Sequence, residues 1–172
     1  MLTAEDEVWL NHLSDTNQVK IVPFDPQVKH IFSQIKQEIQ SALGENISVL
    51  HMGATSLGIS GKGDIDVYIP TSPEQFSLKI KKLEQIYGKP GSLYPLKRVR
   101  WNKLVKGIDV EIFLVNQDHL SWKRSLAFEN YLKQHPEALD EYEKLKEDLA
   151  GVSTREYYRR KIEFMNKILG IR

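Results

Sequence analysis

Two short segments alternate acidic with apolar side chains, and this alternation constrains the fold more than any other feature of the sequence. The first covers residues 64–69 (Asp-Ile-Asp-Val-Tyr-Ile) and the second covers residues 108–112 (Ile-Asp-Val-Glu-Ile). In a β-strand, residues i and i+2 project from the same face. Each segment is therefore expected to be a half-buried strand with two acids on one face and branched residues toward a core.

The acids of these segments are candidate metal ligands. Two carboxylates close together on one strand face repel each other, and a cation between them offsets that repulsion. Carboxylate oxygens suit Mg²⁺ or Mn²⁺. If the strands are neighbours, four carboxylates converge: Asp64, Asp66, Asp109 and Glu111. The alternative is that these acids are only the solvated faces of half-buried strands.

A glycine-punctuated stretch precedes the first acidic strand. At its start, Gly53, Ala54, Thr55 and Ser56 are small enough to let backbone N–H groups approach phosphate oxygens. The glycine spacing matches neither a Walker P-loop nor a dinucleotide-binding fingerprint. An ordinary glycine-rich turn is the alternative interpretation.

Three cations near these segments are candidate phosphate contacts. Lys62 immediately precedes the acidic strand, and Arg98 and Arg100 alternate on one face of a later strand. The planar donor fork of arginine suits a triphosphate. The alternatives are a plain loop lysine and a solvated hairpin.

The rest of the pattern predicts an α/β (α+β) chain with a mixed sheet. Capping signals, glycine stops and apolar periodicity mark helices, and period-two runs mark strands. The expected helices begin near residues 3, 26, 73, 119, 136 and 153, and the expected strands cover 47–52, 64–69, 97–104 and 108–115, with an extended run at 19–22. We expect one domain over residues 1–172, with an α/β core at about 19–116 and C-terminal helices at 118–170.

Composition excludes several classes of function. The chain has no cysteine, so thiolate chemistry is excluded. Its 24 basic and 23 acidic side chains give a net charge of +1, which provides no general field for a long nucleic acid. The N-terminus lacks the basic and apolar regions of an export signal, and no apolar run approaches the roughly 20 residues of a membrane span. We expect a cytoplasmic chain that binds neither membranes nor long nucleic acids.

The order of these features resembles the nucleotidyltransferase (polymerase-beta-like) superfamily. In that superfamily a small pair after a strand, here residues 53–54, precedes an acid-apolar-acid strand, here residues 64–67. The resemblance implies a third carboxylate on a later strand, a place that Glu111 or Asp109 fits. It also implies a mixed sheet with helices.

A closer resemblance is to the GrpB family of small bacterial proteins. The shared features lie at residues 24–26, 51–57, 62, 126–128, 131–132, 135–137, 142, 145–146, 157, 161 and 164. Many members have serine where Ala54 stands, and many lack the first acid, which this chain supplies as Asp64. Carrying both acids makes catalysis more credible, and the resemblance implies little about the substrate.

Together these features predict metal-dependent transfer of a nucleoside monophosphate from a nucleoside triphosphate to an unknown acceptor. Asp64, Asp66 and Glu111 are the expected catalytic acids, and Mg²⁺ or Mn²⁺ is the expected cofactor. Two other functions stay open. One is a non-catalytic nucleotide-binding module on the same fold, and the other is an interaction protein whose C-terminal helices present a partner surface.

Overall fold

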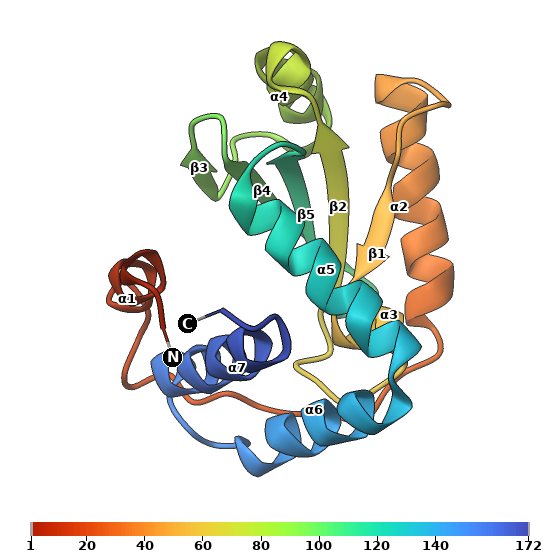
Figure 1. The fold of residues 1–172 in the computed structure, drawn as a ribbon. Coiled ribbons are helices and arrows are strands. Elements are labelled where there is room, and N and C mark those ends of the chain that lie inside the picture. The colour runs from red at the N-terminus through yellow and green to blue at the C-terminus, as the bar shows by residue number, and fades with distance from the viewer. Residues whose placement is uncertain (1, 172) are drawn as a thin grey trace. The chain divides into compact units, whose positions relative to one another are not determined.

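The computed structural model describes residues 2–171, which form helices and a single five-stranded sheet (Figure 1). The helices are α1 (Ala4–Leu10), α2 (Val28–Leu43), α3 (Ala54–Leu57), α4 (Pro73–Tyr87), α5 (Leu120–Gln134), α6 (Pro136–Asp148) and α7 (Thr154–Ile168). The strands are β1 (Leu50–Met52), β2 (Ile65–Thr71), β3 (Ser92–Tyr94), β4 (Arg98–Val105) and β5 (Ile108–Asn116). The expected mixture of helices and strands is confirmed.

Contacts group the chain into two compact units. The sheet unit contains residues 24–58 and 63–123, and the helical unit contains residues up to 23, residues 59–62 and residues from 124 onward. Helix α5 begins in the sheet unit and continues into the helical unit. The expectation of one domain stays a prediction.

The sheet is mixed, with strand order β1-β2-β5-β4-β3. Strands β2 and β5 are parallel, and the other neighbours are antiparallel. The two acidic segments of the sequence are therefore adjacent central strands. Their parallel register places Asp66 opposite Glu111.

One face of the sheet is buried against α2 and α4. Ile65, Val67 and Ile69 of β2 are fully buried there, together with alternate residues of β5 and apolar side chains of the two helices. Because strand side chains alternate, burying this set directs the acids of β2 and β5 to the opposite face. The hydrophobic core thus determines which way the carboxylates point.

A two-residue turn sets the register of β4 against β5. Lys106 and Gly107 both have positive φ, 51° and 81°, as a turn whose twist matches a β-hairpin requires. The resulting register places Asn102 of β4 opposite Glu111 of β5. The two strands expected at 97–104 and 108–115 thus form a hairpin.

Some predicted boundaries were wrong. The strand expected at 64–69 continues through Pro70 to Thr71. The short helix α3 and the edge strand β3 were not predicted. The extended run expected at 19–22 lies outside the named strands, and Val22 makes an isolated bridge to Gly61.

The helical unit is held by caps, ring contacts and ion pairs. Thr3 and Asp6 form the predicted capping box of α1. Phe128 packs edge-on against Tyr142, and Arg159 of α7 makes two hydrogen bonds of 3.1 Å to Glu7 of α1. No helix within residues 2–171 has the length and apolar character needed to cross a membrane.

The central strand β5 offers a test of the core. Ile112 is fully buried between β2 and β4, whereas Leu104 on β4 is 67% exposed. Ile112→Ala should lower the free energy of unfolding by about 2–5 kcal/mol through lost burial and a residual cavity. Leu104→Ala should change it by less than about 0.5 kcal/mol. Urea denaturation followed by circular dichroism measures both, and equal losses would contradict this packing.

Candidate metal centre

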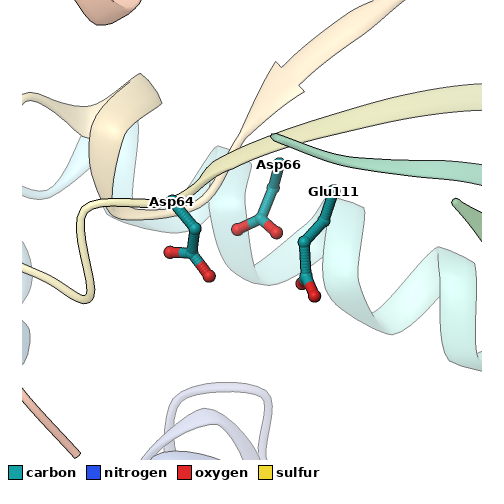
Figure 2. Close-up of side chains that lie close together, drawn as sticks. All are labelled: Asp64, Asp66 and Glu111. Atoms are coloured by element: carbon teal, nitrogen blue, oxygen red, sulfur yellow. The ribbon is translucent and has the colours of Figure 1, made fainter. Parts of the chain in front are cut away.

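Three carboxylates meet on the face of the two central strands that is opposite to α2 and α4. Asp64 lies just before β2, Asp66 lies on β2, and Glu111 lies on β5. Each offers an oxygen, and these ligand atoms lie within 4.8 Å of one another. Figure 2 shows the three side chains projecting toward a common region. All three are partly buried, and together they could hold a metal ion.

Of the two candidate acids on β5, Glu111 is the one that joins the pair from β2. Asp109 lies one strand repeat earlier, opposite Leu104, and its side chain is exposed. It is not part of the group formed by Asp64, Asp66 and Glu111. The parallel register decides this, because it pairs Asp66 with Glu111 and leaves Asp109 before the first paired position, Val110.

Strand β4 holds the third carboxylate in place. Arg100 Nη1 donates to Glu111 Oε1 at 2.9 Å, and Asn102 Nδ2 donates to the same oxygen at 3.3 Å. The Arg100 charge therefore offsets part of the repulsion among the acids. Asn102 is a site neighbour that sequence reasoning missed. The sequence did contain a signal for Asn102, because it alternates with Arg98 and Arg100 and so lies on the same face of the strand.

The glycine before α3 leaves room for the second carboxylate. Gly53 has φ 80° and ψ −167°, a combination that is essentially restricted to glycine. A Cβ added there would overlap Oδ2 of Asp66. Glycine is therefore required at this position for two reasons: the backbone angles exclude other residues, and a side chain would collide with Asp66.

The hydroxyl of Thr55 is used inside the protein. Thr55 is buried, and its Oγ1 donates to the backbone oxygen of Asp64 at 3.0 Å. Nε2 of His51 lies 2.9 Å from the same Oγ1, and the His51 ring stacks on Phe32 with centroids 4.8 Å apart. His51 and Thr55 thus anchor the backbone at Asp64. Ala54 and Ser56 are partly buried in the single turn of α3.

The remaining predicted cations have separate surroundings. Lys62 belongs to the helical unit, where its Nζ lies 5.6 Å from the ring centre of Tyr158. Burial raises the pKa of the neighbouring Tyr157, and the charges of Lys161 and Lys62 act in the opposite direction. Arg98 remains in the sheet unit, on the same strand as Arg100.

Comparison with known proteins places the chain in a family. The sequence model of the GrpB protein family matches residues 18–170. The chain belongs to the GrpB family. A glutamate-rich protein GrpB from Alkalihalophilus pseudofirmus is 26% identical over 168 residues, which cover 88% of this chain and 94% of that relative.

Solved structures agree with the family and the fold. The crystal structure of the conserved protein GrpB from Enterococcus faecalis matches with a TM-score of 0.64 and 22% identity, covering 87% of this chain and 99% of that one. The GLD-2/RNP-8 complex matches with a TM-score of 0.52 and 12% identity, covering 85% of this chain and 59% of that one. The present chain thus has a nucleotidyltransferase-like fold, as its sequence predicted.

The donor set fits a hard divalent cation. All three ligands are carboxylates, and no sulfur ligand is possible in a chain without cysteine. Gly53 keeps the space beside Asp66 open, and Arg100 leaves the second oxygen of Glu111 outside its ion pair. The three side chains therefore have both the chemistry and the spacing of a metal site.

A pair of glycine substitutions tests the packing around Asp66. Gly53 and Gly58 both have positive φ, but only at Gly53 would a Cβ meet another residue. Gly58→Ala should cost about 1–2 kcal/mol of stability from backbone strain alone. Gly53→Ala should cost more, because the same substitution also displaces the Asp66 carboxylate. Chemical denaturation of the two variants gives the comparison, and equal costs would show that the close approach to Asp66 is unimportant.

Proposed function

We propose that this GrpB-family protein is a metal-dependent nucleotidyltransferase that moves a nucleoside monophosphate from a nucleoside triphosphate to an acceptor hydroxyl. The observation that carries the proposal is the meeting of Asp64, Asp66 and Glu111 on one sheet face. The nucleotidyltransferase-like fold supports it, because the acids lie at β2 and on the later strand β5, as the resemblance to that superfamily implies.

Each acid has a distinct place in the proposed reaction. Asp64 and Asp66 would hold Mg²⁺ or Mn²⁺, which neutralises charge on the triphosphate and on the leaving pyrophosphate. Glu111 would face the acceptor hydroxyl and help to place it. The acceptor oxygen forms a bond to the α-phosphorus, the bond from that phosphorus to the β-phosphate bridging oxygen breaks, and the hydroxyl proton passes to a carboxylate or to solvent.

The small residues after β1 are the proposed phosphate contacts. Gly53 lies directly beside Asp66, so backbone N–H groups of residues 53–56 are near the acids. Arg100 is engaged with Glu111 and stays a candidate donor to a phosphate oxygen from the sequence alone. Lys62 stays a candidate from the sequence. The triphosphate is thus proposed to lie on the β1 side of the acids.

One observation favours a second candidate function. The ion pair between Arg100 and Glu111 already neutralises one of the three acids without a metal. A protein that binds nucleotide without chemistry could keep such an arrangement. In that case a triphosphate would bind, but no pyrophosphate would be released.

Metal binding is the first test of the proposal. A ligand that binds only the folded state at ten times its dissociation constant stabilises by about 1.4 kcal/mol. For a chain of this size that corresponds to a rise in Tm of roughly 3–6 °C. Mn²⁺ should produce such a rise in the parent protein, and Asp66→Asn and Asp64→Asn should abolish it.

Asp109→Asn is the matched control for this experiment. It removes the same charge from the same strand that carries Glu111, yet Asp109 is exposed and lies outside the group of three. Its melting temperature should respond to Mn²⁺ as the parent does. A rise that survives in Asp66→Asn, or disappears in Asp109→Asn, would place the metal elsewhere.

Activity is the second test, and it needs no knowledge of the acceptor. Nucleoside triphosphates labelled at the α-phosphate are incubated with Mg²⁺, the protein and a cell extract, and transfer of label and release of pyrophosphate are followed. Asp66→Asn should reduce the rate by roughly 10²-fold or more, because metal contacts strengthen as charge develops on the leaving group. Triphosphate affinity should fall much less.

The Asp109→Asn protein again serves as the control and should retain the parent rate. Equal labelling by the parent and Asp66→Asn proteins would show that the acids do not catalyse the transfer. Triphosphate binding without any labelling would instead support the non-catalytic module.

A further inference from the structure

One face of β4 carries a row of polar side chains that begins at the acids and leads away from them. Asn102, Arg100 and Arg98 alternate on this face. Asn102 is opposite Glu111, which is opposite Asp66, so all these residues share the sheet face that is opposite to α2 and α4. Arg98 is four residues along β4 from Asn102, a separation of roughly 13 Å along the strand.

Two aromatic rings fix the position of the Arg98 guanidinium. Its Cζ lies 5.6 Å from the ring centre of Tyr94 on β3 and 5.5 Å from that of Phe113 on β5. Phe113 in turn stacks on Tyr68 at 4.7 Å, and Tyr68 stacks on Trp122 at 5.4 Å. The cation therefore lies within a continuous row of rings that runs from Tyr94 to Trp122, which restricts its motion before any ligand arrives.

Among residues 2–171, no acid pairs with the same guanidinium. The Arg98 side chain makes no hydrogen bond within this range and its Nε is buried without an acceptor, whereas its backbone pairs with β3 and β5. Arg100, two residues away, has its ion pair with Glu111. A guanidinium without an acidic partner keeps its charge uncompensated, and an oxyanion bound at its Nη N–H groups would make charge-assisted hydrogen bonds there.

The sheet order separates Arg98 from the backbone phosphate contacts proposed at residues 53–56. The strands run β1-β2-β5-β4-β3, with Gly53 following β1 and Arg98 on β4. The acids on β2 and β5 lie between them. In an in-line transfer the acceptor approaches from the side opposite the leaving pyrophosphate. Arg98 therefore lies on the side where an acceptor would enter.

We propose that Arg98, held between Tyr94 and Phe113, binds an oxyanion of the acceptor, such as a phosphate monoester or a carboxylate. The acceptor is then a small anionic molecule that spans from Arg98 to Glu111, a reach on the order of 10 Å. This inference rests on the proposed function where it identifies the bound molecule as the acceptor. Anion binding at Arg98 itself can be measured without metal, nucleotide or turnover.

The test uses inorganic phosphate and acetate as probes on protein freed of divalent metal by a chelating resin. The Nε–H signal of Arg98 is followed by ¹H–¹⁵N NMR at constant ionic strength. At least one probe should shift this signal in a saturable manner. Arg98→Gln should weaken binding of that probe at least tenfold, measured by the displacement of neighbouring backbone signals. Arg98→Lys should also weaken it, because the charge remains but the planar fork is lost.

Two further variants separate a built site from general charge. Lys106→Gln removes one positive charge from the exposed end of the same hairpin and should leave the affinity within about twofold of the parent. Tyr94→Leu keeps Arg98 but removes one ring, and it should weaken binding several-fold. Tyr94 is 41% exposed, so this variant should fold even if a change at Arg98 itself does not.

The proposal is overturned if neither probe shifts the Arg98 signal, or if Arg98→Gln binds the probe as well as the parent does. The outcome is independent of the metal site. Arg98→Gln should keep the Mn²⁺-dependent rise in Tm if both ideas hold. Anion binding at Arg98 in a protein that shows no Mn²⁺ response would sustain the anion site and contradict the proposed function.

Discussion

The parallel pairing of β2 with β5 is the constraint on which the site depends. It sets Asp66 beside Glu111, and a slip of one residue would turn one of these acids into the core. The opposite face prevents that slip, because Ile65, Val67 and Ile112 are fully buried against α2 and α4. The burial of apolar side chains on one face thus supplies the free energy that holds like charges together on the other.

Bringing three carboxylates together is unfavourable, and the surrounding residues reduce the cost without filling the site. Arg100 and Asn102 both donate to one oxygen of Glu111. Gly53 has no side chain and so leaves space for the Asp66 carboxylate, which a Cβ at this position would overlap. The chain through His51 and Thr55 fixes the backbone of Asp64. Each acid therefore has its own support, and these supports come from β4, from the turn before α3 and from β1.

The sequence was most informative where one periodic pattern dominated. The strands around Asp66 and Glu111, the hairpin at 106–107 and the helices after residue 119 follow from alternation, turn chemistry and capping. The choice of Glu111 over Asp109 could not be made, since it depends on the register between strands that are distant in sequence. The short helix α3 was missed because four residues between glycines show no helical period. The Arg98 ring contacts also depend on strand pairing rather than on local sequence.

The two arginines of β4 illustrate how strand geometry gives identical residues different roles. Both lie on the sheet face that is opposite to α2 and α4, and both have a buried Nε without a hydrogen-bond acceptor. Arg100 is near enough to Glu111 to pair with it, so its charge belongs to the acid cluster. Arg98 is one strand repeat farther on and meets aromatic rings instead, which neither neutralise its charge nor accept its Nε–H. Glu111 offsets much of the Arg100 charge, whereas the Arg98 guanidinium has no ion pair among the described residues and is the stronger attraction for an anion. Along β4 the same face therefore changes from an acid cluster at Asn102 to a ring-held cation at Arg98, and its two ends differ in chemistry.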